Sequence, residues 1–562
     1  MNSSAGQREF SSDPAINNLL ASVVSDVRSF AETQVAHVHE LVKIGLALSA
    51  EKNLEILLEM IVSEARRFTH ADGGTLYIKD EEEGSLAFSI VQNDSLKVRM
   101  GGTGEQITWP SVQLINKDGS ENRKNVSAFC ALSGKAINIP DVYDAKGFDF
   151  QGTKDFDKTT GYRSQSMLVI PMRDHEDEII GVLQLLNAMD RNTGQVVEFP
   201  ENEIEIITSL ASQAAIAINN VRLIRGLEEL LNSFVASIAA AIDDKSPYTG
   251  GHIERVAELT EEIVGVINRA ESGKFKDTVL NPDEVKEIKL AAWMHDVGKI
   301  STPEYVVDKS TKLETIFDRI AIVKPRIELL KKDAEIRLLR EALAAGKGTA
   351  PEDAIDAEKK KYEEYGSFLE KVNIGGEFLK DDSVDKIKEL AGLGYELGGK
   401  TMPLLNEDEV KNLTIRKGTL TEDERQVINN HVNVGIKMLT SLPFPRKLRQ
   451  VPLYAGAHHE KLDGSGYPNH LKEEAIPLQA RILAVADVFE ALTAADRPYK
   501  EGKRLSESMR ILGFMEKDRH LDSDLCDLLV ESGLIQKYAK KHLSERQQDD
   551  FEWKGEKKLI NC

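Results

Sequence analysis

Histidines and aspartates gather in a few short motifs in the second half of the chain. The sequence has 12 histidines, and five of them lie in YTGGHIERV, WMHDVGKI, NNHVNVG and HHEKLDGSGYP. One aspartate follows a histidine directly in WMHDVGKI, and another lies in AVADVFEALTAADRPYK. The resulting candidate metal ligands are His252, His295, Asp296, His431, His458, His459 and Asp487.

These residue types suit two divalent ions that act on a phosphodiester. Hydrolysis of a phosphodiester needs a nucleophile at neutral pH and stabilisation of charge at phosphorus, and two metal ions about 3.5–4 Å apart supply both. Five imidazoles and two carboxylates are enough ligands for two octahedral ions with open positions for water and substrate. Nitrogen and oxygen ligands without thiolate favour iron, manganese or similar ions over structural zinc.

The motifs differ in how strongly they indicate a metal site. A lone histidine on a helix is more often a hydrogen-bonded structural residue than a metal ligand. The string HHEKLDGSGYP is different, because paired histidines followed by an acidic, glycine-containing turn and Gly-Tyr-Pro are improbable in an ordinary surface loop. Gly464 and Gly466 let the backbone turn tightly beside the expected site.

The segment 243–545 resembles an HD-GYP domain, with His295 and Asp296 as the HD pair and residues 466–468 as the GYP triplet. The resemblance implies an all-α metal phosphodiesterase that hydrolyses cyclic di-GMP. Its product would be linear pGpG, or GMP after a second step, formed by attack of a metal-bridging hydroxide on phosphorus. Asp296 would bridge the two ions, and the other six candidate ligands would complete their coordination.

The resemblance also implies which residues contact the substrate. Lys299, one turn after Asp296, would contact the scissile phosphate and protonate the leaving oxygen. Arg497 and Lys500, in DRPYK, would hold the substrate phosphates, a task that suits a guanidinium fork. For Tyr467, substrate contact and simple packing stay equally open.

The residues that precede His252 bear on the number of metal ions in the site. Trinuclear members carry a glutamate one helical turn before the first histidine, where this chain has Tyr248. We therefore expect a binuclear site and pGpG as product, although Asp243 and Asp244 lie upstream and could reach in. Glu460, directly after the paired histidines, is expected to orient an imidazole rather than to bind metal.

A long insertion, about 313–416, separates DKSTKLET from RKGTLTEDE, where the family has a short loop. Its charged, helical pattern, with Pro325 and the turn AAGKGTAPED, predicts a helical hairpin at the rim of the site. It is either a structural elaboration or dimer contact, or a lid that alters access of the substrate.

The first half of the chain predicts a sensor. Residues 1–47 read as a tail and a helix, and residues 48–223 resemble a GAF domain with α+β fold, carried by ADGGTLYIKD, SMLVIPM and EIIGVLQLLN. Some GAF domains that bind cyclic nucleotides carry an Asn-Lys pair after the last strands, but here Asn187 is followed by Ala188. The GAF ligand is therefore unknown, and a role in dimerisation without ligand is the alternative.

A long helix is expected to connect the two domains at 203–242. Apolar residues recur every seven positions in two rows, one with Ile207, Ala214 and Val221 and a companion with Leu210 and Ala217. This pattern is typical of a coiled coil and predicts a parallel homodimer. The alternative is a helix packed on its own domains.

Bulk composition limits the other possibilities. The chain of 562 residues has 72 basic and 93 acidic residues, a net charge of −21, which argues against general nucleic-acid binding. Three separated cysteines, no secretory leader and no membrane span predict a cytoplasmic protein of the bacterial signalling type. Two alternatives to a cyclic di-GMP phosphodiesterase stay open: an enzyme for another cyclic dinucleotide or nucleotide, and a non-catalytic receptor.

Overall fold

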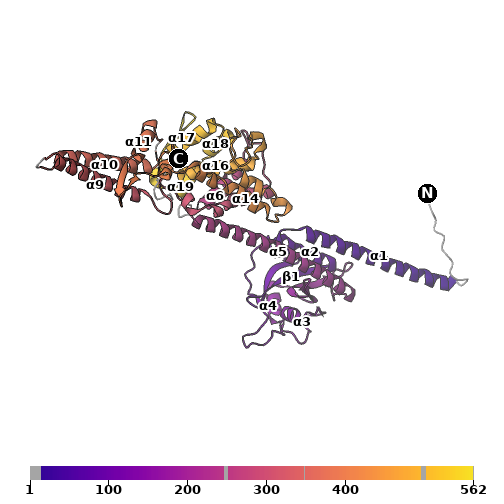
Figure 1. Ribbon diagram of the computed structural model, residues 1–562. Coiled ribbons are helices and arrows are strands. Elements are labelled where there is room, and N and C mark those ends of the chain that lie inside the picture. Colours follow the sequence, from indigo (N-terminus) through magenta and orange to yellow (C-terminus); the bar gives the residue numbers. More distant parts are fainter. Residues whose placement is uncertain (1–13, 246–250, 347–348, 377, 495–501, 561–562) are drawn as a thin grey trace. The chain divides into compact units, whose positions relative to one another are not determined.

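The computed structural model describes residues 14–245, 251–346, 349–376, 378–494 and 502–560 (Figure 1). The chain divides into two compact units, Met1–Leu230 and Leu231–Cys562. The division falls inside one helix, α5 (Glu201–Lys245). No helix within the described ranges combines the length and the apolar character that crossing a membrane requires.

The first unit is built on one antiparallel sheet with the order β3-β2-β1-β7-β6-β5, to which β4 adds beside β2 and β8 beside β7. Helices flank it. The elements are α1 (Pro14–Ala50), α2 (Leu54–Thr69), β1 (Ala71–Asp80), β2 (Ser85–Asn93), β3 (Val98–Gly101), β4 (Val112–Gln113), α3 (Val126–Ser133), β5 (Ile137–Ile139), α4 (Gln151–Thr160), β6 (Met167–Arg173), β7 (Ile179–Met189) and β8 (Val196–Val197). The expected α+β fold is confirmed.

Two apolar layers hold this sheet. On one side α2 and the first half of α5 pack on the central strands, with Leu57, Ile61 and Ile207 fully buried. On the other side α3 and aromatic residues such as Phe150 cover the sheet. The strand β6, between β7 and β5, is buried at nearly every position, and its sequence is therefore a continuous apolar run rather than an alternating one.

The second unit is mainly helical. Its helices are α6 (His252–Asn268), α7 (Pro282–Met294), α8 (Glu304–Val307), α9 (Ile320–Ala344), α10 (Glu352–Asn373), α11 (Asp381–Ala391), α12 (Glu407–Leu413), α13 (Glu422–Asn429), α14 (His431–Thr440), α15 (Val451–Gly456), α16 (Leu478–Thr493), α17 (Leu505–Lys517), α18 (Ser523–Glu531) and α19 (Leu534–His542), with the 3-10 turns η1 (Val297–Ser301), η2 (Arg446–Leu448), η3 (Glu473–Ala475) and η4 (Glu545–Gln547). Among them α16 is apolar on nearly all sides, as a helix at the centre of a core must be.

The expected all-α fold of the second unit is confirmed, and short strands add to its helices. Two antiparallel hairpins are present: β9 (Gly394–Leu397) with β10 (Lys400–Pro403), and β11 (Phe551–Trp553) with β12 (Glu556–Lys558). Their strands have four and three residues. Strands this short are below the length at which an alternating pattern can be recognised.

The heptad rows of α5 serve a different purpose from the expected one. Ile207, Ala214 and Val221 are buried in the core of the first unit, and Val235 and Ile242 are buried in that of the second. Most positions of these rows therefore face their own units rather than a partner helix, although Ile224, seven positions after Ala217, is 58% exposed. A different row is exposed and apolar, made of Leu223, Leu227, Leu230 and Phe234.

The inserted segment has its own hydrophobic core. Figure 1 shows α9 and α10 lying side by side, and they pack through residues such as Val323, Ile327 and Leu369. The expected helical hairpin is therefore present, but α11, the β9–β10 hairpin and α12 add to it and share the same core. Pro325 lies inside α9.

Two buried lysines join the ends of this insertion. Lys309 places its Nζ 2.8 and 2.9 Å from the two carboxylate oxygens of Glu424, on α13, and 2.8 Å from the Oδ1 of Asn412. Lys312 donates to two backbone carbonyl oxygens at the end of α12. The chain therefore leaves and re-enters the helical unit at one place, and α13 leads directly into α14.

We expect Lys309→Met to destabilise the second unit by about 3 kcal/mol, because removing one partner of a buried ion pair leaves the other charge uncompensated. The side chain of Lys309 is fully buried and that of Glu424 is 19% exposed. Thermal unfolding monitored by circular dichroism measures the effect. The matched control is Lys324→Met, whose partner Glu370 is exposed, and which should change stability by less than about 1 kcal/mol. Equal shifts in the two variants would contradict the prediction.

Candidate metal centre

The structure brings the seven predicted ligands to one buried place from five parts of the fold. One histidine begins α6, a His-Asp pair follows α7, one histidine begins α14, a histidine pair follows α15, and one aspartate lies within α16. In that order they are His252, His295, Asp296, His431, His458, His459 and Asp487. All but His252 and His459 are at least nine-tenths buried.

One side of the centre combines imidazoles with carboxylates. The Nε2 of His252 lies 3.4 Å from the Oδ1 of Asp487 and 3.5 Å from the Oδ2 of Asp296. The Nε2 of His295 lies 3.3 Å from that same Oδ2 and 3.9 Å from the Oδ1 of Asp487. His252, His295 and Asp487 offer three ligand atoms within 4.8 Å of one another, which is close enough to share one ion.

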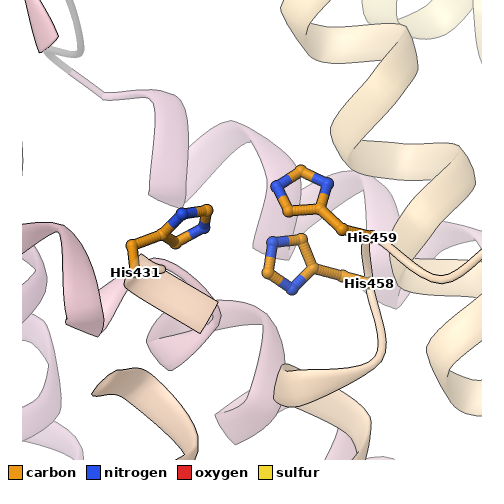
Figure 2. Close-up of side chains that lie close together, drawn as sticks. All are labelled: His431, His458 and His459. Atoms are coloured by element: carbon orange, nitrogen blue, oxygen red, sulfur yellow. The ribbon is translucent and has the colours of Figure 1, made fainter. Parts of the chain in front are cut away.

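The other side is made of imidazoles alone. Figure 2 shows His431, His458 and His459 grouped together, and their ligand atoms also lie within 4.8 Å of one another. The ring centroids of His458 and His459 are 4.0 Å apart. The second oxygen of Asp296, Oδ1, lies 3.3 Å from the Nε2 of His431. Asp296 thus turns one oxygen to each side.

The free ring nitrogens show that these residues fit metal ions. In His295, His431 and His458 the Nδ1 lies 2.5–2.7 Å from the backbone carbonyl oxygen three residues earlier. A carbonyl oxygen only accepts, so the hydrogen is on Nδ1 and the lone pair of Nε2 is free. These three Nε2 atoms are buried and have no hydrogen-bond partner among the described residues. Buried polar atoms are almost always satisfied, and cations bound on the two sides of the centre would satisfy all three.

Electrostatics divide the centre into the same two sides. Burial disfavours a proton on His252, but hydrogen bonds to Asp296, Asp487 and Glu490 outweigh burial and hold its pKa well above the usual value. The pKa of His295 is raised as well, against burial, chiefly by Asp296. Burial alone would raise the pKa of Asp296, yet nearby cations, Lys299 first, keep it well below the ordinary value.

On the other side, burial and the neighbouring imidazoles act together. Burial and the proximity of His459 and His295 hold the pKa of His458 well below its usual value. Burial, the largest cause, lowers the pKa of His459 to about 4. Both rings are therefore neutral at pH 7, which is the form in which an imidazole binds a metal.

The predicted substrate residues fall into three groups. Lys299, on η1, places its Nζ 2.6 Å from the Oδ2 of Asp296 and is 27% exposed, so it lies between the centre and solvent. The ring of Tyr467 lies against that of His459, with centroids 4.9 Å apart. Arg497 and Lys500 lie outside the described residues.

The GYP loop is built around a close backbone approach. A Cβ on Gly466 would lie 2.3 Å from the backbone nitrogen of Lys461, so only glycine fits there. Glu460, expected to orient an imidazole, instead accepts hydrogen bonds from the backbone N–H groups of Asn469 and Leu471 at 2.7 and 2.9 Å. That expectation was wrong, because the carboxylate holds the loop and not a ligand.

Two residues at the centre were missed by the sequence analysis. Glu490 contacts the Nδ1 of His252, and Arg255 contacts Glu490. A signal was present: Glu490 and Asp487, three positions apart, are the two charged residues of the stretch ILAVADVFEALT. Asp243, considered as an additional ligand, accepts a hydrogen bond from the backbone N–H of Gly251 at 3.0 Å, directly before His252.

Comparison with known proteins identifies both units. Residues 53–218 match the GAF domain family and residues 352–525 match the HD domain family. The HD match begins inside the insertion, so it contains the imidazole side of the centre and Asp487, whereas the His-Asp pair precedes it. The expected pairing of a GAF domain with an HD domain is confirmed.

Several bacterial proteins are similar in sequence to part of this chain. The cyclic di-GMP phosphodiesterase response regulator RpfG of Xanthomonas campestris is 38% identical over 152 residues, 27% of this chain and 37% of that protein. The 3′3′-cGAMP-specific phosphodiesterase 2 of Vibrio cholerae is 36% identical over 154 residues, 27% of each. The cyclic di-GMP phosphodiesterase of Thermotoga maritima is 40% identical over 98 residues, 17% of this chain and 26% of that protein. The chain thus matches well under half the length of these relatives.

Proposed function

We propose that this chain, which pairs a GAF domain with an HD domain carrying a GYP triplet, is a metal-dependent phosphodiesterase that hydrolyses cyclic di-GMP to linear pGpG. The observation that carries the proposal is the group of three buried, unsatisfied Nε2 atoms beside an aspartate that faces both sides of the centre. Two of the relatives named above are cyclic di-GMP phosphodiesterases, which favours this substrate.

The proposed site holds two divalent ions, iron or manganese. His252, His295 and Asp487 would hold one, and the three grouped imidazoles of Figure 2 would hold the other, with Asp296 shared. When bound, such ions supply Lewis acidity and an activated water for phosphodiester hydrolysis. They also supply the local positive charge that a dianionic substrate needs on a chain with a net charge of −21.

Protein side chains would position the substrate. Lys299, at the solvent side of Asp296, is placed to contact the scissile phosphate and to donate a proton to the leaving oxygen. Arg497 and Lys500 keep their proposed role as phosphate contacts on the resemblance alone. The packing of Tyr467 against His459 favours a role in holding that imidazole, beside any contact with substrate.

Anaerobic turnover tests the proposal. The protein is loaded with ferrous or manganous ion, incubated with cyclic di-GMP, and the nucleotides are separated by chromatography. We expect pGpG, with none formed after chelation. The second candidate substrate is 3′3′-cGAMP, which is favoured by the similarity to the Vibrio cholerae enzyme, so both are compared at equal concentration. Binding of cyclic di-GMP without turnover by fully metallated protein would establish a receptor instead.

We further propose that the chain works as a homodimer through α5, so that the GAF domain can regulate hydrolysis. The exposed row Leu223, Leu227, Leu230 and Phe234 has apolar side chains 58–66% exposed at alternating spacings of four and three residues, the pattern of a coiled-coil seam. An apolar groove between α1 and α5 is lined by residues such as Val42, Leu46 and Ile216, the last of which lies seven positions before Leu223 on α5. A second copy of the same helix would cover this surface.

We expect Leu227→Glu with Leu230→Glu to convert the dimer to a monomer, because each seam position would bury a charge against its own copy. Sedimentation equilibrium measures the change in mass. Glu229→Lys is the matched control, since Glu229 is exposed on the same helix and outside the seam. A wild-type protein that sediments as a monomer at tens of micromolar would contradict the proposed dimer, and the proposed phosphodiesterase activity would be unaffected.

A further inference from the structure

A fully buried carboxylate lies behind one of the proposed metal ligands. Glu490, on α16, has no exposed surface. Its Oε2 contacts the Nδ1 of His252, and its Oε1 accepts a hydrogen bond from the Nε of Arg255 at 2.7 Å. The Nε2 of the same imidazole points toward Asp487 and Asp296. The imidazole therefore lies between Glu490 on one side and the ligand carboxylates on the other.

The Nδ1 of His252 has a different kind of partner from that of three other proposed ligands. His295, His431 and His458 each use the carbonyl oxygen three residues earlier to hold their Nδ1–H. His252 is the first residue of α6, and Gly251 before it has a left-handed backbone, with φ of 78°. The acceptor at the Nδ1 of this ring is Glu490, which lies on another helix, α16.

The two helices meet through matching pairs of residues. On α16, Asp487 and Glu490 are three positions apart and therefore lie on one face. On α6, His252 and Arg255 are also three positions apart. Asp487 and His252 face the metal centre, and Glu490 and Arg255 form the contact behind them. Arg255 compensates the charge that Glu490 would otherwise bury alone.

From this geometry we infer that Glu490 is a positioning residue for one metal ion: it orients His252 with the lone pair of Nε2 toward the ion on the Asp487 side, and Arg255 holds Glu490 in place. The carboxylate keeps the hydrogen on Nδ1 and makes Nε2 a stronger donor to metal. The ion held by His431, His458 and His459 does not depend on this contact. The inference rests on the proposed metal site but not on the identity of the substrate.

Binding of Mn²⁺ to the full chain, without nucleotide, tests the inference. Free Mn²⁺ is measured by its electron paramagnetic resonance signal during a titration. Wild-type protein should bind two ions. Glu490→Gln keeps the shape of the side chain but removes its charge, and we expect it to weaken one of the two sites about 10–100-fold while the other is unchanged. Arg255→Met should weaken the same site.

A second pair of variants separates positioning from a general loss of stability. Glu409→Gln is the matched control, because Glu409 is 1% exposed and pairs with Arg326 at 2.7 Å in the inserted segment. It should leave both Mn²⁺ sites unchanged. In a His252→Ala background, Glu490→Gln should have no further effect on either site, because Glu490 acts through that imidazole.

Two results would overturn the inference. One is wild-type affinity at both sites in Glu490→Gln. The other is an equal loss of affinity from Glu490→Gln in the presence and absence of His252. A wild-type protein that binds no Mn²⁺ would instead overturn the proposed metal centre itself. A protein that binds two ions but hydrolyses neither cyclic dinucleotide would leave the inference standing and remove the proposed substrate.

Discussion

Replacing Asp296 by asparagine should lower the rate of cyclic di-GMP hydrolysis by about 10³-fold or more. The carboxylate oxygens of Asp296 lie 3.3 Å from the Nε2 atoms of His295 and His431, on opposite sides of the centre. An amide has one oxygen and no charge, so it cannot serve both sides. The loss corresponds to about 4 kcal/mol of transition-state stabilisation, the order expected when metal assistance is removed.

Two measurements distinguish this result from misfolding. Metal content by mass spectrometry should fall below two ions per chain in Asp296→Asn, while the circular dichroism spectrum stays that of the wild type. Asp318→Asn is the matched control: Asp318 accepts hydrogen bonds from Thr311 and Asn373 at 2.9 and 2.8 Å at the root of the insertion. Its rate should stay within about threefold of wild type. Full activity of Asp296→Asn would rule out this aspartate as the shared ligand.

Lys299→Met is expected to slow turnover about 100-fold while leaving both metal ions bound. A positioned proton donor contributes about 10²–10⁴-fold, and methionine keeps the length of the side chain without its charge. The Nζ of Lys299 lies 2.6 Å from the Oδ2 of Asp296, so the ammonium competes with a metal ion for that oxygen. Metal affinity should therefore be equal or higher in the variant, even though the rate falls.

A lower rate together with unchanged or higher metal affinity distinguishes a catalytic role of Lys299 from a structural one. A variant that loses both would show that Lys299 supports the site rather than the reaction. Lys299→Arg serves as a second variant, since it keeps the charge and should recover part of the phosphate contact but little of the proton transfer. A rate within threefold of wild type in Lys299→Met would contradict the proposed role.

Residue types and short motifs were sufficient to predict the chemistry of the site and the type of each unit. Whether a side chain offers an imidazole or a carboxylate depends on residue type alone. The His-Asp pair and the GYP triplet are short sequence motifs that can be recognised without knowing the fold. The apolar runs in SMLVIPM and EIIGVLQLLN, which carry the GAF resemblance, lie in the paired strands β6 and β7. The inserted segment was also visible, because its charged helical pattern interrupts a short loop.

Contacts between distant segments were decided only by the tertiary structure. Glu460 and Glu490 are both acidic residues close to a ligand in sequence, yet only Glu490 orients an imidazole, because α16 lies against the start of α6. The rows of α5 are a second example. A heptad pattern shows which positions are apolar, but only the packing of the folded chain decides which surface covers each row. The division of the seven candidate ligands into two sides likewise depends on distances among five parts of the fold, which the spacing of these residues in the sequence does not give.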